Sequence, residues 1–321
     1  MSQSTSQRIT VTRVAGHIGA DIDGVDLSKP LVPGTVAAIR EALLTHKVLF
    51  FHDQQISHAE HVAFGRAFGE LTLRPRPQSG GELDEHPEIC TISPTIDVDR
   101  YGRDIEAHYR SRWVTANGGW HTDMTHAINP PMASILRAET APPYGGDTQW
   151  TNLVAAYEGL SAPLRRFVDD LRAEHTFWAG YQMSEHDEVD RSIMEMVNAK
   201  AMASVHPVVR LHPETDERAL FVSPSRTSHI LGMSRVESRR LLELLYEQMT
   251  RPEYTVRLRW APGTVAFWDN RSTAHIAAAD VDASDGSRIL HRVTLVGDIP
   301  VGPGGFTSQA VAGRPLGSAD R

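Results

Sequence analysis

The sequence has a single cysteine, no long apolar run and no recognisable leader segment, and each absence excludes a class of protein. Cys90 alone cannot form an intrachain disulfide or a site of several thiolates, which is typical of a protein in a reducing cytosol. The amino terminus lacks the apolar core of a signal peptide, and the apolar run at 48–51 is far too short to span a bilayer. We therefore expect a cytoplasmic protein with no membrane partner.

Basic charge and common catalytic motifs are also missing. The 321 residues include 32 Lys and Arg against 40 Asp and Glu, a formal net charge of -8, whereas a protein that binds a phosphate backbone needs a basic surface. No Walker A loop, Rossmann fingerprint, nucleophile elbow or HExxH helix is present. Nucleic acid is therefore not expected as a partner, and the chemistry has to be sought in other residues.

Periodicity and turn residues predict a mainly β protein with flanking helices. Helices are predicted at 35–46, 58–68, 152–160, 163–171 and 235–249. Strands are predicted at 48–51, 132–137, 147–151, 254–260, 264–268 and 289–296. Because the strands lie on either side of a helical middle, we expect an antiparallel sandwich or jelly-roll barrel. No internal linker divides the chain, so a single domain over 1–321 is predicted, ending in a surface tail at 301–321.

Histidine is the residue in excess, with 16 in the chain, and two of them stand in patterns suited to a metal. His121 and Asp123 lie two apart in WHTDMTH, so on an extended segment they share a face. Chance alone produces such a pair in a chain of this composition, and a surface ion pair is the alternative. His275 adds weight, because it ends WDNRSTAH directly after the strand at 264–268. Two imidazoles and one carboxylate are typical of non-haem iron(II) oxygenases, and ligand type alone leaves zinc open.

Two arginines follow the third of these residues. Arg288 and Arg292 are four apart on a strand pattern, which places them on one face about 13 Å apart. Guanidinium groups on an inner face need anions, and a dicarboxylate cosubstrate and an anionic substrate would each supply one. The alternative is that both pair with acids nearby in the sequence, namely Asp280, Asp282 or Asp298.

These residues stand in motifs that resemble the taurine dioxygenase family of iron(II)- and 2-oxoglutarate-dependent oxygenases, which includes alkylsulfatases and phenoxyacetate-herbicide dioxygenases. The likeness runs from about Arg13 to Pro300 and is greatest to the alkylsulfatase and taurine branch. It implies a double-stranded β-helix, a jelly roll of the cupin kind, that uses Fe(II), 2-oxoglutarate and dioxygen and forms dimers or tetramers. The motifs are IGADIDGVDL, HKVLFFHDQ, FGRAFGEL, WHTDMTH, PYGGDTQW, HPVVRLHPET, WDNRSTAH and HRVTLVGD.

Carried over position by position, the resemblance implies a role for each catalytic and cofactor residue. His121, Asp123 and His275 would bind the iron. Arg288 would form a salt bridge with the distal carboxylate of 2-oxoglutarate, and the hydroxyl of Thr148 would support the same carboxylate.

The substrate pocket is implied in the same way. Arg292 would meet the anionic group of the substrate, and Asn117 and Phe177 would line the pocket. The chain departs from the taurine enzymes at Arg74 and Pro77, where they place a histidine and a tyrosine for the sulfonate. Taurine itself is therefore not the expected substrate.

Three further departures fall near the expected site. His126 stands where phenylalanine is usual, and the gap from His275 to Arg288 is two residues longer than in taurine dioxygenase. The stretch 97–113 is longer and more basic than in the relatives. It is predicted to be a lid or active-site loop, and a solvated charged face is the alternative.

The resemblance thus implies an enzyme of sulfur metabolism that hydroxylates a carbon of a small anionic organosulfur compound, an alkyl sulfate ester or a sulfonate, and releases succinate and carbon dioxide. A second reading keeps this chemistry for a carboxylate substrate, such as a phenoxyalkanoate or an amino-acid-like metabolite. A third, from another class, is a metal-bound small-molecule sensor without turnover.

Overall fold

The computed structural model describes residues 8–74, 85–93, 105–114, 118–199, 201–278, 280 and 288–317. Asn117, Pro77 and the first part of the predicted lid, 97–104, lie outside the described residues. Among the helices of the described ranges, none combines the length and the apolar character needed to cross a membrane.

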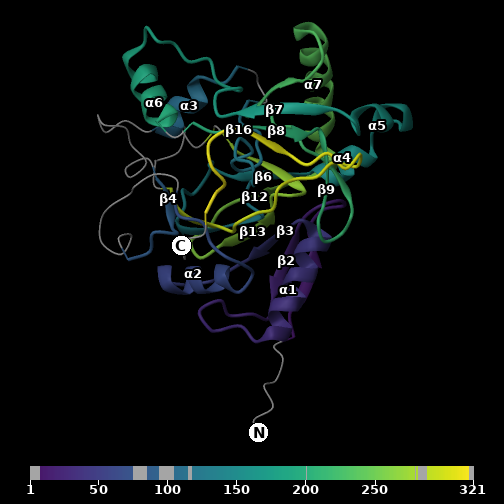
Figure 1. The fold of residues 1–321 in the computed structure, drawn as a ribbon. Coiled ribbons are helices and arrows are strands. Elements are labelled where there is room, and N and C mark those ends of the chain that lie inside the picture. The colour runs from purple at the N-terminus through teal and green to yellow at the C-terminus, as the bar shows by residue number, and fades with distance from the viewer. Residues whose placement is uncertain are drawn as a thin grey trace.

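Helices and strands carry the labels of Figure 1. The helices are α1 (Pro33–His46), α2 (His58–Arg66), α3 (Ile105–Ser111), α4 (Leu153–Glu158), α5 (Ala162–Val168), α6 (Glu188–Asn198), α7 (Arg235–Met249) and the 3₁₀ turn η2 (Pro252–Tyr254). The strands are β1 (Thr10–Arg13), β2 (Ala20–Asp23), β3 (Val48–Phe51), β4 (Cys90–Ile92), β5 (Ala133–Thr140), β6 (Thr148–Asn152), β7 (Arg172–Thr176), β8 (Ala203–Pro207), β9 (Val209–Leu211), β10 (Arg218–Leu220), β11 (Thr227–Ile230), β12 (Thr255–Leu258), β13 (Val265–Asp269), β14 (Thr273–Ala277), β15 (Ile289–Thr294) and β16 (Gln309–Ala312).

Within the described residues the strands form one large sheet and smaller ones. The large sheet has the order β1-β2-β3-β13-β5-β15-β4, and a three-stranded sheet has the order β12-β6-β14. A four-stranded sheet, β11-β7-β8-β16, and the pair β10-β9 complete the β structure. All of the pairings are antiparallel except β2 with β3, which is parallel. The expected jelly roll is confirmed by these sheets and by the structural relatives described below.

Strand β13 shows how the sequence builds two layers on one sheet. Val265 and Phe267 pack with α1 and α2, whereas Ala266 and Trp268 pack with Trp150 of the three-stranded sheet. Successive side chains of a strand point to opposite faces, so one apolar strand serves both cores. Figure 1 shows α1 and α2 together on one side of β3 and β13. Burial of a large apolar side chain such as Phe267 contributes about 1.5–3 kcal/mol.

Most of the predicted helices begin at a residue whose side chain caps the first turn by accepting a hydrogen bond from a backbone amide. Ser57 accepts a hydrogen bond from the Glu60 amide while the Glu60 side chain accepts one from the Ser57 amide, and Ser234 and Glu237 repeat this capping box at α7. Asn152 caps the helix that follows it. The helix predicted at 58–68 ends at Arg66, two residues early.

The middle of the chain was wrongly predicted to be mainly helical. After α5 it runs through β7, α6 and the strands β8 to β11, which are short. Strands of three to five residues with buried polar side chains, such as His175 and His206, lack the apolar alternation from which strands are recognised. The strand predicted at 254–260 is also shorter, because Tyr254 belongs to η2 and the strand ends at Leu258.

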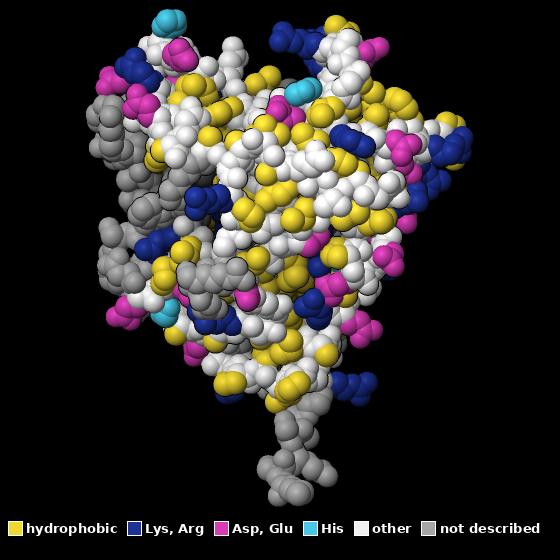
Figure 2. All heavy atoms as spheres, in the orientation of Figure 1, with side chains coloured by type: hydrophobic (Ala, Val, Ile, Leu, Met, Phe, Trp, Pro, Cys, Tyr) yellow, Lys and Arg dark blue, Asp and Glu magenta, His cyan; other side chains and the backbone are white. Residues whose placement is uncertain are grey.

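The charged surface is mixed. On the face drawn in Figure 2, Lys and Arg side chains are interspersed with Asp and Glu over the described residues. On α7, Arg239 and Arg240 both pair with Glu243. The tail at 301–321 contains β16, which pairs with β8 and whose residues are exposed, so this part of the tail is ordered structure on the surface.

Candidate active site: a His-Asp-His cluster at the edge of β14

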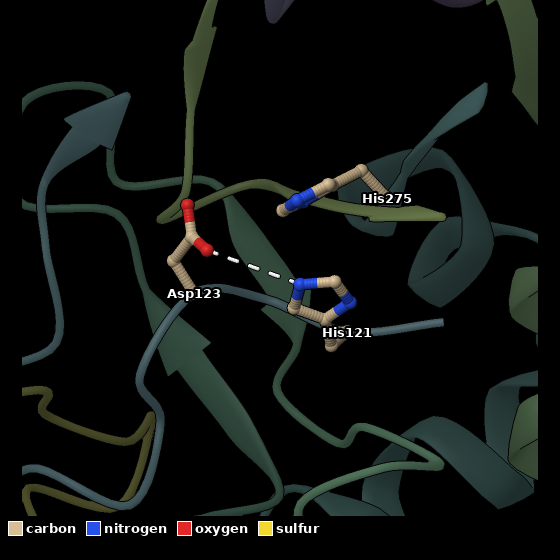
Figure 3. Close-up of side chains that lie close together, drawn as sticks. All are labelled: His121, Asp123 and His275. Atoms are coloured by element: carbon tan, nitrogen blue, oxygen red, sulfur yellow. Dashed lines mark ion pairs between the residues drawn. The ribbon is translucent and has the colours of Figure 1, made fainter. Parts of the chain in front are cut away.

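Three side chains from two distant segments of the chain converge beside β14. His121, Asp123 and His275 each offer one ligand-type atom, and these atoms lie within 4.8 Å of one another. Figure 3 shows the three side chains pointing toward one another. In the described residues no other group of this kind was found that could hold a metal ion.

Backbone hydrogen bonds bring the two histidines together. The His121 amide donates to the His275 carbonyl at 2.9 Å, and the His275 amide donates to the His121 carbonyl at 2.7 Å. His121 therefore extends the sheet past β14, whose other edge pairs with β6. The Thr122 hydroxyl donates to the Thr273 carbonyl at 2.8 Å and ties the same two segments again. A separation of more than 150 residues in sequence is closed by one antiparallel bridge.

A chain of donors holds the carboxylate. The Trp268 indole donates to Asn270, the Asn270 amide donates to the Ser134 hydroxyl at 2.9 Å, and that hydroxyl donates to Asp123 Oδ2 at 2.6 Å. Arg292 donates to the other oxygen, Oδ1, at 2.9 Å. Both carboxylate oxygens are thereby oriented by neighbours on the large sheet or just after it.

The chain turns sharply after the carboxylate. Met124 has φ 47°, in the left-handed region that residues other than glycine seldom adopt. The Ala127 amide closes the turn by donating to the Met124 carbonyl at 2.9 Å. Backbone strain of this kind is held in place by surrounding structure and is common at functional sites.

The electrostatics of the cluster suit a cation. Burial would raise the pKa of Asp123, but Arg292 and the two histidines outweigh it and hold the pKa well below its usual range. Burial lowers the pKa of His275 to about 3, with a contribution from His121, and burial also lowers the pKa of His121. At neutral pH the cluster is one carboxylate and two neutral imidazoles, the protonation states that a metal ion requires.

The ring nitrogens fit a bound metal. His121 Nδ1 donates to the Gly119 carbonyl at 2.8 Å, which leaves Nε2, 3.9 Å from Asp123 Oδ1, as the ligand atom. The buried Nδ1 of His275 has no hydrogen-bond partner among the described residues. A buried nitrogen without a partner costs about 1–3 kcal/mol, and a metal ion or a metal-bound water would remove this cost.

The residues predicted for 2-oxoglutarate lie on strands next to the cluster. Thr148 begins β6 and pairs with Ala277, two residues beyond His275, and its hydroxyl accepts a hydrogen bond from the Trp260 indole at 2.9 Å. Arg288 is buried and lies directly before β15. The strand itself starts at Ile289 with a register irregularity, so the face shared by Arg288 and Arg292 does not follow from regular strand geometry.

Two of the three acids offered as alternative partners for the two arginines pair with other arginines. Asp298 accepts two hydrogen bonds from Arg210, and Asp280 pairs with Arg257. Asp282 lies outside the described residues. Arg292 instead forms an ion pair with Asp123, a contact that the sequence analysis did not anticipate.

Phe177, predicted to line the pocket, belongs to an aromatic cluster. It stacks on Tyr181 with centroids 5.9 Å apart and meets the edges of Tyr109 and His126 at 5.7 Å and 5.6 Å. Tyr109 comes from α3, in the part of the predicted lid that the structure describes. Asn117, the other predicted pocket residue, lies outside the described residues.

The described half of the 97–113 stretch packs on α6 (Figure 1). The buried carboxylate of Asp190 accepts hydrogen bonds from His108 at 2.6 Å and Arg112 at 3.0 Å. These two basic residues are therefore paired with a protein acid. Farther along, the Trp113 ring occupies the space that a β-carbon on Gly119 would need, so this segment reaches the loop that carries His121.

Sequence reasoning missed three residues of the site. Ser134 and Asn270 lie within segments that were recognised, a strand and the WDNRSTAH motif, but their side chains meet only in the folded chain. Arg226 lies before β11 in a segment without any recognised motif. No signal in a single sequence identifies any of these contacts.

Some other buried histidines of the described residues have structural partners. His206 bonds to Ser308 and the Thr125 carbonyl, and His212 bonds to Asp269 at 3.0 Å. Asp269 also accepts three hydrogen bonds from Arg271. This network explains part of the WDNRSTAH motif as structural support for the strand turn before His275.

Comparisons with known proteins agree with this geometry. The profile described as "Taurine catabolism dioxygenase TauD, TfdA family" matches residues 10–294. An α-ketoglutarate-dependent sulfate ester dioxygenase of Pseudomonas putida is 39% identical over 306 residues, covering 94% of this chain and 94% of the relative. An alkylsulfatase of Acinetobacter baylyi is 35% identical and covers 98% and 93%.

A solved structure and a further relative complete the comparison. The crystal structure of a putative α-ketoglutarate-dependent taurine dioxygenase from Burkholderia xenovorans has 49% identity and a TM-score of 0.80, covering 96% of this chain and 100% of that chain. An α-ketoglutarate-dependent 2,4-dichlorophenoxyacetate dioxygenase of Cupriavidus pinatubonensis is 31% identical and covers 88% and 96%.

Proposed function

Because the chain belongs to the taurine catabolism dioxygenase family, TauD and TfdA, we propose that it hydroxylates the carbon next to the sulfur-containing group of a small alkyl sulfate ester. The enzyme class is that of the family, an iron(II)- and 2-oxoglutarate-dependent dioxygenase. Hydroxylation next to a sulfate ester gives an unstable product that collapses to an aldehyde and sulfate. The observation that carries the proposal is the convergence of two imidazoles and one carboxylate at the edge of β14.

We assign the holding of iron to His121, Asp123 and His275. Bound iron, with 2-oxoglutarate and dioxygen, supplies the oxidant for the carbon and releases succinate and carbon dioxide. The Gly119 carbonyl fixes the tautomer of His121, and Ser134 and Arg292 keep Asp123 ionised and oriented.

We assign the distal carboxylate of 2-oxoglutarate to Arg288 and Thr148. Arg288 is a buried guanidinium, whose planar fork of donors matches a carboxylate, and Thr148 is the first residue of the strand that pairs with β14. For Arg292 we propose contact with the anionic group of the substrate from its place beside Asp123, with Phe177 and Asn117 along the organic part.

The test is a substrate panel with the iron(II)- and 2-oxoglutarate-loaded enzyme. Hexyl sulfate should stimulate oxygen consumption and release succinate and sulfate in equal amounts. Hexanesulfonate releasing sulfite instead would place the substrate among sulfonates. Stoichiometric succinate also eliminates the reading of a sensor without turnover, whereas no succinate with any organosulfur compound contradicts the proposal.

A carboxylate substrate is the second candidate, because the 2,4-dichlorophenoxyacetate dioxygenase covers 88% of this chain at 31% identity. Release of a phenol and glyoxylate from a phenoxyacetate, at a higher kcat/KM than any sulfate ester, would favour it.

We further propose that the protein acts in the cytoplasm as a dimer or tetramer. The single cysteine, a free thiol at the start of β4, supports a reducing compartment. Light scattering after size exclusion tests the assembly, and a monomer at micromolar concentration would contradict it.

A further inference from the structure

Arg226 is a second cation near the candidate metal site. Its guanidinium carbon lies 4.3 Å above the centroid of Phe177 and 5.4 Å from that of Tyr181, and its Nη1 donates to the Phe177 carbonyl at 2.8 Å. Two aromatic rings and one carbonyl fix the plane of the guanidinium. Its position is therefore set before any ligand arrives.

This guanidinium has no acid as a partner in the part of the chain that the structure describes. No ion pair between described residues includes Arg226, and its buried Nε has no hydrogen-bond partner. Leaving a buried donor of a charged group without a hydrogen-bond partner is unfavourable. By contrast Arg112, on the described part of the predicted lid, pairs with both Asp187 and Asp190. An anion is the partner that the surroundings of Arg226 do not supply.

The backbone places Arg226 close to the first histidine of the cluster. The Ser225 amide donates to the Trp120 carbonyl at 3.4 Å, so the residues before Arg226 and before His121 are in direct contact. Burial lowers the pKa of His121, and the positive charge of Arg226 lowers it further. The two groups therefore lie within electrostatic reach of each other.

The same cluster offers a wall for an organic group. Phe177 and Tyr181 stack face to face, and the edge of His126 meets Phe177. Burial lowers the pKa of His126 to about 3, with a contribution from Arg226, so His126 is neutral at physiological pH. A cation framed by rings and a neutral imidazole suits a ligand with a charged oxyanion head and an apolar body.

We propose that Arg226 binds the oxyanion head of the substrate together with Arg292 and selects anionic substrates, as a specificity-determining residue beside the metal cluster. The inference rests on the proposed function, whose anionic substrate it addresses. Arg292 also donates to Asp123 in this structure, whereas Arg226 offers a guanidinium that is paired with no acid of the described residues, on the aromatic side of the site. A sulfate or sulfonate oxygen would accept hydrogen bonds from the guanidinium N–H groups that do not donate to the Phe177 carbonyl.

The test measures binding separately from turnover. Hexyl sulfate, hexanesulfonate and the neutral hexyl methyl sulfone are titrated calorimetrically into the enzyme loaded anaerobically with iron(II) and 2-oxoglutarate. Arg226→Met, which removes the charge at similar volume, should weaken the two anions about 10- to 100-fold and leave the sulfone unchanged. Arg226→Lys, which keeps the charge, should recover a part of that loss.

Controls separate a local effect from a general one. Arg239→Met removes one charge from the exposed face of α7 and should leave all three affinities unchanged. The visible charge-transfer band of iron(II) with 2-oxoglutarate, measured for each variant, reports whether the cluster is intact. If the only role of Arg226 is to hold its loop against Phe177, the substitution to Met will lower the affinities for the anions and for the sulfone equally. This result overturns the inference.

The remaining outcomes distinguish a failure of the inference from a failure of the proposed function. Equal anion affinity in wild type and Arg226→Met overturns the inference, even where the wild type releases sulfate and the proposed function stands. Charge-selective binding that depends on Arg226 supports the inference, even where no sulfate or sulfite is released under oxygen and the proposed function fails. A wild type that binds neither anion contradicts the inference.

Discussion

Two groups of histidines lie next to each other in this fold and have different hydrogen-bond partners. His121 and His275 stand beside a carboxylate, and His275 Nδ1 has no hydrogen-bond partner among the described residues. His175 and His206, on β7 and β8, have partners for both ring nitrogens: Thr125 and Thr227 for the first, Ser308 and the Thr125 carbonyl for the second.

This difference separates the proposed metal ligands from histidines that support the fold. His121 is half-buried and the other three histidines are buried, and all four have lowered pKa values, so neutrality does not distinguish the two groups. What distinguishes the first pair is an open nitrogen next to an oriented carboxylate, which is the arrangement a metal completes. The second pair fixes the turn after Asp123, since its partners include Thr125.

The largest expected effect comes from a substitution in the cluster that contains His121 and His275. Asp123→Ala removes the only carboxylate of the cluster and leaves Arg292 facing two imidazoles, so we expect loss of iron(II) binding and of turnover to background. Iron titration of the purified variant measures this. His206→Asn, which changes the second group, should keep wild-type iron stoichiometry, and an Asp123→Ala protein with full iron occupancy would contradict the distinction.

A smaller effect tests the orientation of the carboxylate. Ser134→Ala removes the donor to Asp123 Oδ2 without touching a proposed ligand, and loss of such a supporting hydrogen bond typically lowers metal affinity about 10- to 100-fold. The iron(II) dissociation constant checks it. Ser238→Ala, at a buried serine on α7, is the matched control and should leave the constant unchanged.

The second group should affect stability and not the metal. His206→Leu leaves the Thr125 carbonyl without its donor, which should lower the free energy of unfolding by about 1–3 kcal/mol. Chemical denaturation gives this value, and iron affinity of the folded variant should equal that of wild type. A variant as stable as wild type would show that the hydrogen bonds of His206 contribute nothing net.

The smallest effect is a pH dependence. Burial lowers the pKa of His206 to about 4, below the usual 6.5, so the unfolded chain takes up the proton first. Its contribution is fully present above pH 6.5 and is lost as the pH falls toward 4, by about 1 kcal/mol per pH unit. Denaturation at pH 7 and pH 5 measures the slope, to which His175 and His275 also contribute, and His206→Leu should make it shallower by this amount; equal slopes would refute the assignment.

The features that could be predicted from the sequence depend on residues that are close together in the chain. The capping boxes at Ser57 and Ser234 and the strand at Val48–Phe51 depend on residues a few positions apart, and the structure has them where the sequence places them. The motifs WHTDMTH and WDNRSTAH, which carry the proposed metal ligands, were also recognisable, because their residue types and order resemble those of a known family. Short strands with polar residues, such as β7 and β8, had no such local signal.

The sequence by itself therefore determined the enzyme family, the candidate ligands and the helices with strong caps, since each is encoded by residue type and short-range spacing. Only the tertiary structure decided that Arg292 meets Asp123, that Trp268, Asn270 and Ser134 form a hydrogen-bonded chain to the carboxylate, and that Arg226 lies between aromatic rings beside His121. The reason is that these contacts join residues far apart in the chain, whose meeting depends on how sheets and loops pack as a whole.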